Sequence, residues 1–149
     1  MELLIKMPFF KDEAMYDNRI AHFYKRAQIT ASDISLAFRG QGLGYFYDLP
    51  KLTIFADNAV PHVLRVDGII EYDDKLASRI DSGELILPSS DEEIEIRAAA
   101  IYASELVVEY LNSLGNPIMA KELDYVLWNR AHDPIYRARP RHRTRTVFY

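Results

Sequence analysis

A carboxylate lies on the apolar face of one segment whose residues recur at helical spacing. In IMAKELDYVLWNRA, Asp124 shares a face with four apolar residues, Ala120, Leu123, Leu127 and Ala131. Tyr125 and Trp128 flank it. A carboxylate in such surroundings resists charge in the free protein and stabilises a positive charge that develops opposite it, as happens when a glycosidic bond breaks. The sequence leaves a second interpretation open, in which Asp124 is structural and anchors Arg97 or an arginine near the C-terminus.

An aromatic loop precedes a carboxylate and a lysine. Tyr45, Phe46 and Tyr47 come directly before Asp48, and Lys51 follows three residues later. Flat aromatic faces beside a hydrogen-bond acceptor and a cation suit a planar heterocycle. The same composition also suits a loop that its aromatic residues pin to the body of the protein.

Two more carboxylates have open roles. Asp57 follows an apolar run, so it is either a second site carboxylate or a cap for a helix that begins near Val60. Glu105 falls on the apolar stripe of the segment after Ser90, which Ile94, Ala98, Ile101 and Val108 define. We expect Glu105 to point into the core, where it would pair with an arginine, accept backbone hydrogen bonds or hold a proton.

Several other chemistries find no support in the sequence. The four histidines have no metal-ligand spacing, and the chain has no cysteine, so we expect no metal site and no cofactor. Gly40, Gly42 and Gly44 lack the lysine and the flanking elements of a phosphate-binding loop. No serine lies in a nucleophile elbow. Acid–base or electrostatic work by carboxylates is the enzymatic chemistry that remains.

The charge is unevenly distributed. The net charge is −4, but residues 130–149 carry six arginines against Asp133, a net +5, so the remainder carries −9. A basic end on an acidic body suggests a partner that bears phosphate, or arginines that dock onto the acidic body.

Glycine, proline and capping residues predict a chain of helices. We expect a first helix after Asn18 that ends near Gly40, followed by a loop over 41–51. We also expect a helix over 60–67 with Pro61 in its first turn, and a short helix over 73–82. The run LTIFAD (52–57) allows a strand. Ser90 and Glu93 predict a capping box at the start of a helix that runs to about Leu114.

The last part of the chain is predicted to hold one more helix and a tail. Asn116 and Pro117 suit the start of a helix that continues to about residue 131, and residues 133–149 form a basic, extended tail. The fold class is therefore mainly α, helical, with at most a short β element, in a single domain over residues 1–149. The absence of cysteine fits a cytoplasmic location, or a nuclear one as well, and MELLIKMPFF is too short for a secretory signal. No apolar run approaches the roughly 20 residues of a membrane span, so no membrane partner is expected.

Five segments together resemble one family. They are FYKRAQI (23–29), LTIFADNAVPHVLR (52–65), SSDEEIEIRAA (89–99), LDYVLW (123–128) and HRTRTVFY (142–149). Their order and spacing are similar to those of the queuosine salvage proteins, the queuosine 5′-phosphate N-glycosylase/hydrolase family. The match covers roughly the C-terminal half of a family member.

The resemblance implies a fold akin to the helix-hairpin-helix DNA glycosylases. It also implies hydrolysis of queuosine 5′-phosphate to queuine and ribose 5-phosphate without a metal or redox cofactor, so that queuine returns to tRNA modification. In this view Asp124 is the catalytic residue and stabilises the oxocarbenium-like sugar. Substrate-binding candidates are Phe46 and Tyr47 against the base, with Asp48, Lys51, Asp57, Tyr125 and Asn129 around it.

The sequence departs from the family pattern at two places. Asn58 and Ala59 stand where the family usually has Tyr-Arg, and Asn129 stands where an acidic residue often follows the tryptophan. The expected partners are the nucleoside 5′-phosphate and queuine, together with a missing N-terminal half or a second copy that completes the pocket. Direct binding of nucleic acid is not expected. Two alternatives stay open: a non-catalytic module that binds queuine, a nucleotide or tRNA, and a truncated, inactive family member.

Overall fold

Helices dominate the computed structural model, which describes residues 2–149. The main helices are α1 (Lys25–Ala37), α2 (Val60–Val66), α3 (Asp74–Asp81), α4 (Asp91–Ser113), α5 (Ala120–Arg130) and α6 (Pro134–Arg137). Short 3-10 turns cover Leu4–Lys6, Pro8–Phe10, Gly42–Gly44 and Leu49–Lys51. The sheet in this part of the chain has two strands, β1 (Glu13–Tyr16) and β2 (Arg19–His22). The mainly α expectation is confirmed, whereas the comparison with helix-hairpin-helix glycosylases stays a prediction.

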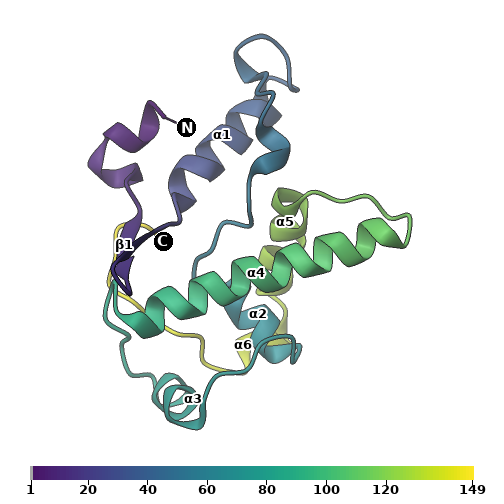
Figure 1. Ribbon diagram of the computed structural model, residues 1–149. Coiled ribbons are helices and arrows are strands. Elements are labelled where there is room, and N and C mark those ends of the chain that lie inside the picture. The colour runs from purple at the N-terminus through teal and green to yellow at the C-terminus, as the bar shows by residue number, and fades with distance from the viewer. Residues whose placement is uncertain (1) are drawn as a thin grey trace.

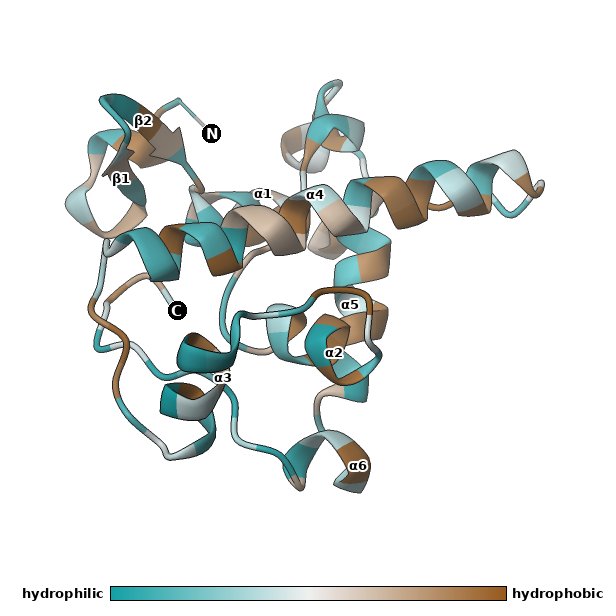
Figure 2. Cartoon of the chain, turned by 60° about the horizontal axis from the view of Figure 1, so that its bottom comes forward, coloured by the Kyte–Doolittle hydropathy of each residue, from teal (hydrophilic) through white to brown (hydrophobic). Residues whose placement is uncertain are grey.

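The long helix α4 organises the molecule. It crosses the structure, with α1 and the hairpin on one side and α2, α3 and α6 on the other (Figure 1). Helices α2 and α5 pack against it, and the shared core includes Val60, Val63, Leu64, Ile94, Ala100, Leu123 and Leu127. The end of α4 extends past the rest of the chain (Figure 2), and Tyr110 in its last turns and Leu114 directly after it are exposed. None of the helices over residues 2–149 combines the length and apolarity of a membrane span.

The start of α4 follows the prediction, but its buried face does not. Ser90 Oγ accepts a hydrogen bond from Glu93 N at 3.3 Å, while Glu93 Oε2 accepts one from Ser89 N at 3.2 Å instead of closing the box on Ser90. Glu105 is exposed, so the expectation of a core carboxylate there is wrong. The buried face of α4 is rotated relative to the predicted apolar stripe because it includes the ion pair of Glu93 and Arg97. The prediction considered only apolar residues and so left this pair out.

The first predicted helix begins six residues later than expected. Asn18 does not cap a helix: with φ of 59° it forms the tight turn between β1 and β2, beside Asp17 at φ of 44°. Short polar side chains tolerate this left-handed backbone, which is the geometry of a two-residue hairpin turn. Residues 19–22 therefore pair as a strand, and the helix starts at Lys25.

The LTIFAD run is extended but does not form a strand. Its backbone groups bond to side chains of three helices: Gln28 Oε1 accepts from Thr53 N at 2.9 Å, Asp124 Oδ1 accepts from Phe55 N at 2.7 Å, and Arg97 Nε donates to Ala56 O at 3.0 Å. Buried backbone groups need such partners when no neighbouring strand supplies them. The segment is thereby fixed between α1, α4 and α5.

Helices α2 and α3 agree with the prediction, whereas the C-terminal elements differ in detail. Pro61 lies in the first turn of α2, and Asp73 caps α3 by accepting from Lys75 N and Leu76 N, both at 3.0 Å. The predicted start of α5 at Pro117 is wrong, because Asn112 Oδ1 binds Ile118 N at 2.8 Å and holds that residue outside the helix.

The basic C-terminal segment lies against the body. Its first residues form the single turn of α6, which the prediction of an extended tail over 133–149 did not include. Beyond α6 the chain is extended, and Arg143 O accepts a hydrogen bond from Ile86 N at 2.9 Å. His142 is buried beside this contact.

Candidate active site

Asp124 is a buried carboxylate with little compensation for its charge. The side chain lies in the middle of α5 with the residue 7% exposed, and its Oδ1 accepts from Phe55 N at 2.7 Å. No arginine reaches it within residues 2–149, so the anchoring role that the sequence left open is wrong. Burial raises the pKa of Asp124 to about 6, with the nearby Asp57 charge adding to the rise and the Phe55 N–H opposing it. Its second carboxylate oxygen has no hydrogen-bond partner among these residues.

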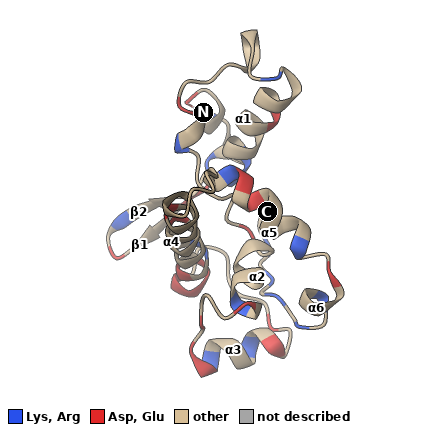
Figure 3. Cartoon of the chain, turned by 90° about the vertical axis from the view of Figure 1, so that its right-hand side faces the viewer, with Lys and Arg blue, Asp and Glu red and all other residues tan. Residues whose placement is uncertain are grey.

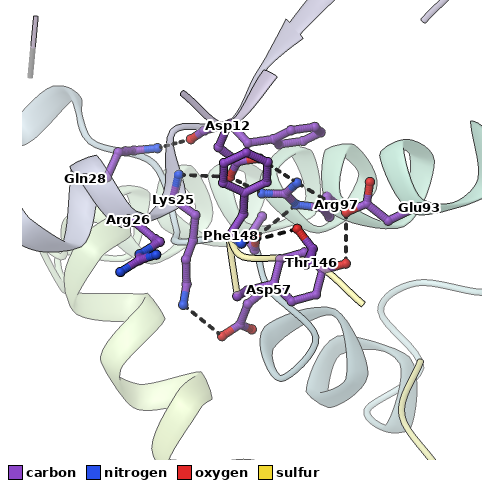
Figure 4. A network of polar contacts seen from close by, with 12 residues as sticks. Asp12, Lys25, Arg26, Gln28, Asp57, Glu93, Arg97, Thr146 and Phe148 are labelled. Atoms are coloured by element: carbon purple, nitrogen blue, oxygen red, sulfur yellow. Dashed lines mark hydrogen bonds and ion pairs between the residues drawn. The ribbon is translucent and has the colours of Figure 1, made fainter. Parts of the chain in front are cut away.

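Asp57 lies close to Asp124 but has partners for both oxygens. Its Oδ1 accepts from Ala59 N at 2.7 Å and Val60 N at 3.3 Å, which caps the first turn of α2. Its Oδ2 lies 3.5 Å from the ammonium of Lys25, on α1 (Figure 4). Both alternatives that the sequence left open are thus compatible with the structure, since one oxygen caps the helix and the other faces the Lys25 cation.

A buried ion network holds these groups in place. Arg97 Nη1 and Nη2 donate to Asp12 Oδ1 and Oδ2 at 3.0 and 2.5 Å, and Nη1 also donates to Glu93 Oε1 at 3.2 Å (Figure 4). All three side chains are at most 4% exposed. Asp12 Oδ2 in turn accepts from Lys25 N at 3.2 Å. The network therefore joins the N-terminal segment, α1, α4 and, through Ala56 O, the segment that carries Asp57.

Aromatic rings complete this network. The Arg97 guanidinium stacks over Phe23 at 3.9 Å from the ring centroid, and Tyr149 lies on it at 5.0 Å. The Tyr149 hydroxyl donates to Glu93 Oε1 at 2.9 Å, so the C-terminal residue of this chain takes part in the same cluster.

The structure separates the predicted binding residues into two groups. Asp57 and Asp124 come together with Lys25, whereas the predicted contacts in the aromatic loop lie in a segment that projects from the end of α1 (Figure 1). Phe46 is half-buried and Tyr47, Asp48 and Lys51 are exposed. Across residues 2–149, no hydrogen bond or ion pair connects this loop to Asp57 or Asp124.

The remaining candidates lie on the outer face of α5. Tyr125 is 70% exposed, and Asn129 is exposed with its Nδ2 donating to Tyr125 O at 2.7 Å. No group of three or more potential metal ligands clusters in the described residues. Lys25 was missed as a site residue by sequence reasoning, although it stands in the FYKRAQI segment.

A family comparison places this arrangement in context. The model of the family described as "Queuosine salvage protein" matches residues 1–149. The chain belongs to the queuosine salvage protein family. Two curated relatives within this family are named queuosine 5′-phosphate N-glycosylase/hydrolase, one from Sphaerobacter thermophilus at 44% identity and one from Dictyostelium discoideum at 39%. A mouse protein of the same name is 35% identical.

The queuosine salvage family match covers nearly all of this chain but less than half of each relative. The aligned region is 95% of this chain and 44% of the Sphaerobacter relative, 94% and 44% for the Dictyostelium relative, and 100% and 47% for the mouse relative. The chain therefore spans about half the length of the curated relatives that it matches.

Proposed function

We propose that the chain contributes the carboxylate site of an N-glycosidase that hydrolyses queuosine 5′-phosphate and releases queuine. The observation that carries this proposal is the buried, weakly compensated Asp124 beside the Lys25–Asp57 pair. Relatives that share most of this chain carry the name of that activity. The substrate of this chain would thus be a queuosine nucleotide.

Asp124 fits the role of stabilising the sugar. When the bond between the anomeric carbon and the base nitrogen breaks, positive charge develops on the sugar. A carboxylate that is poorly compensated in the free protein gains more from that charge than one already paired with a cation. Burial raises the pKa of Asp124 to about 6, so the group is largely ionised at neutral pH while remaining desolvated.

Asp57 and Lys25 fit a binding role beside Asp124. Their charges already compensate one another at 3.5 Å, and their side chains are 11% and 15% exposed. A substrate hydroxyl can hydrogen-bond to either partner, and a substrate amino group can donate to Asp57, without a large change in charge. Water then adds to the anomeric carbon, and the departing base receives the proton that balances the hydrolysis.

The remaining substrate contacts belong to the same proposal. Phe46 and Tyr47 would border the flat base, with Asp48, Lys51, Tyr125 and Asn129 as further contacts. The four loop residues, Phe46, Tyr47, Asp48 and Lys51, reach the carboxylates only if the aromatic loop folds toward α5 on binding. A cytoplasmic location and the need for a second chain segment to complete the pocket also stay proposals.

The test is to incubate the purified chain with queuosine 5′-phosphate and to follow free queuine by chromatography. We expect release by the native chain, and a loss of about 100-fold or more in turnover for Asp124→Asn, because electrostatic stabilisation of this kind contributes on the order of 10²–10³ in rate. Asp33→Asn is the matched control, since Asp33 is an exposed aspartate on α1. Equal turnover for Asp124→Asn and the native chain would overturn the catalytic role. Ligand binding without release by the native chain would favour a binding module.

A further inference from the structure

A basic hollow lies at the far end of α5 from Asp124. It has a volume of about 370 Å³ and is lined by His62 of α2, Ala131 and His132 after α5, Arg137 of α6, and Arg139 and Arg141 of the following segment. Basic residues mark the ends of α5 and α6 on this side of the molecule (Figure 3). Three arginines and two histidines thus converge on one concavity.

The positive charge in the hollow is poorly balanced by the protein. Arg137 and Arg141 form no ion pair with any residue from 2 to 149, and Arg139 reaches Asp81 only at 3.7 Å. Burial lowers the pKa of His62, and the nearby charges of Arg141, Arg65 and Arg139 lower it further. Like charges held close together destabilise one another unless an anion joins them.

One buried polar atom at this site has no partner. His62 is 4% exposed, and its Nε2 bonds to Tyr136 O at 2.7 Å, which places the ring proton there when the imidazole is neutral. Its Nδ1 is buried and makes no hydrogen bond within the described part of the chain. This nitrogen is buried beneath the hollow, so the cations that face solvent there are the exposed side chains of Arg137, Arg139 and Arg141.

The geometry points to a binding site for a small phosphate monoester in the hollow of His62, His132, Arg137, Arg139 and Arg141. Arginine binds phosphate oxygens through its planar, forked donors. A phosphate monoester carries about −1.5 to −2 charge at neutral pH and three strong acceptor oxygens, which match the three guanidinium groups of the hollow. The volume suits a phosphate with a small organic group.

The hollow is a less suitable surface for nucleic acid. A nucleic acid backbone needs an extended basic stripe that contacts several phosphates. Here the cations face one concavity, and Asp81 and Asp133 lie beside them. The site is also separate from the proposed catalytic carboxylates, because its lining excludes Lys25, Asp57 and Asp124. It begins after the end of α5, which continues for six residues beyond Asp124, about 9 Å at the helical rise per residue.

The test measures binding of inorganic phosphate to the purified chain by calorimetry, with chloride at matched ionic strength as the reference anion. We expect saturable phosphate binding that Arg137→Gln and Arg141→Gln each weaken about tenfold, since each removes a charge-assisted hydrogen bond. Arg145→Gln is the matched control, because Arg145 is exposed in the same segment but does not line the hollow. The Asp124→Asn variant should bind phosphate as the native chain does, so the result is independent of glycosidase activity.

Two further readouts locate the ligand and identify its class. Phosphate should shift the imidazole NMR signals of His62 and His132 but not those of His22, which lies on β2. Equal weakening in Arg145→Gln, or binding lost with Lys25→Met, would overturn the proposed site. A 20-nucleotide RNA that competes with phosphate, binds more tightly and weakens steeply with salt would show instead that the hollow is part of a nucleic-acid surface.

Discussion

Burial of Asp124 makes the free energy of unfolding depend on pH. Its pKa is raised to about 6 from the ordinary 3.8, so the folded state holds the proton more tightly than the unfolded chain. The stabilising contribution of the protonated form is therefore complete below pH 4 and is lost as the pH rises through 6. A shift of this size corresponds to about 3 kcal/mol at neutral pH, by order of magnitude.

We predict that Asp124→Asn increases the free energy of unfolding at pH 7 by about 1–3 kcal/mol. The amide keeps an oxygen that can accept from Phe55 N but carries no charge to desolvate. Urea unfolding of both proteins at several pH values from 4 to 7 measures the difference, which should vanish near pH 4. Destabilisation at pH 7 would instead show that Asp124 is an anchor of the fold.

His142 is predicted to act in the opposite direction. Burial lowers the pKa of His142 to about 4, and neither ring nitrogen has a partner within residues 2–149. Stability from the neutral ring is complete above about pH 6.5 and is lost as the pH falls toward 4. Between pH 7 and pH 4, the free energy of unfolding should therefore fall less for His142→Leu than for the native chain. The control is His22→Leu, because His22 is exposed. Identical acid profiles for the native chain and His142→Leu would contradict this.

At the scale of elements, the network around Arg97 holds together segments that are distant in sequence. Asp12 and Arg97 are 85 residues apart, and the Arg97 side chain also bonds to Ala56 O beside Asp57. Removing one member of a buried ion network leaves the others charged and uncompensated, which costs about 3–5 kcal/mol. We predict such a loss for Arg97→Met in urea unfolding.

The matched control for Arg97→Met is Arg79→Met. Arg79 also forms two ion pairs, with Glu84 and Glu92, but its partners are exposed by 51% and 38%, so the expected cost is about 1 kcal/mol or less. Similar losses for the two variants would show that burial does not decide the strength of the network. Combining Arg97→Met with Asp12→Leu and Glu93→Gln should recover part of the lost stability.

Sequence reasoning located the elements with local signals better than those with distant partners. Pro61 and Ser90 gave the starts of α2 and α4 because such signals act within one turn, and the helix predicted over 73–82 matches α3 within one residue at each end. The hairpin was missed because its strands have four residues each, too few for a period to appear. Asp124 was recognised as buried from helical spacing, whereas its approach to Asp57 and Lys25 depends on how α5, the 52–58 segment and α1 pack together.

At the scale of the whole molecule, the C-terminal residues and the start of α1 meet near one side chain, Arg97. Phe23 and Tyr149 lie against Arg97, and Arg26 donates to Val147 O at 3.0 Å. The C-terminal residues also bond to the loop before α4, through Ile86 N and Arg143 O. The final segment is therefore part of the support of the carboxylate site, in addition to being basic.

We predict that deletion of residues 142–149 lowers the free energy of unfolding by several kcal/mol, on the order of a lost buried aromatic side chain together with its hydrogen bonds. The deletion removes the Tyr149 ring that lies on Arg97 and the Tyr149 hydroxyl that donates to Glu93. Since Arg97 also holds the segment that carries Asp57, this segment should become less rigid, and turnover should fall together with stability. Urea unfolding and queuine release measure the two effects.

Since the deleted chain could fail to fold, Tyr149→Phe is a milder change. It keeps the ring over Arg97 but removes the hydroxyl, with an expected loss of about 1 kcal/mol in the free energy of unfolding. A Tyr149→Phe protein of native stability, together with a folded and active deletion, would show that the C-terminal segment lies on the site without supporting it.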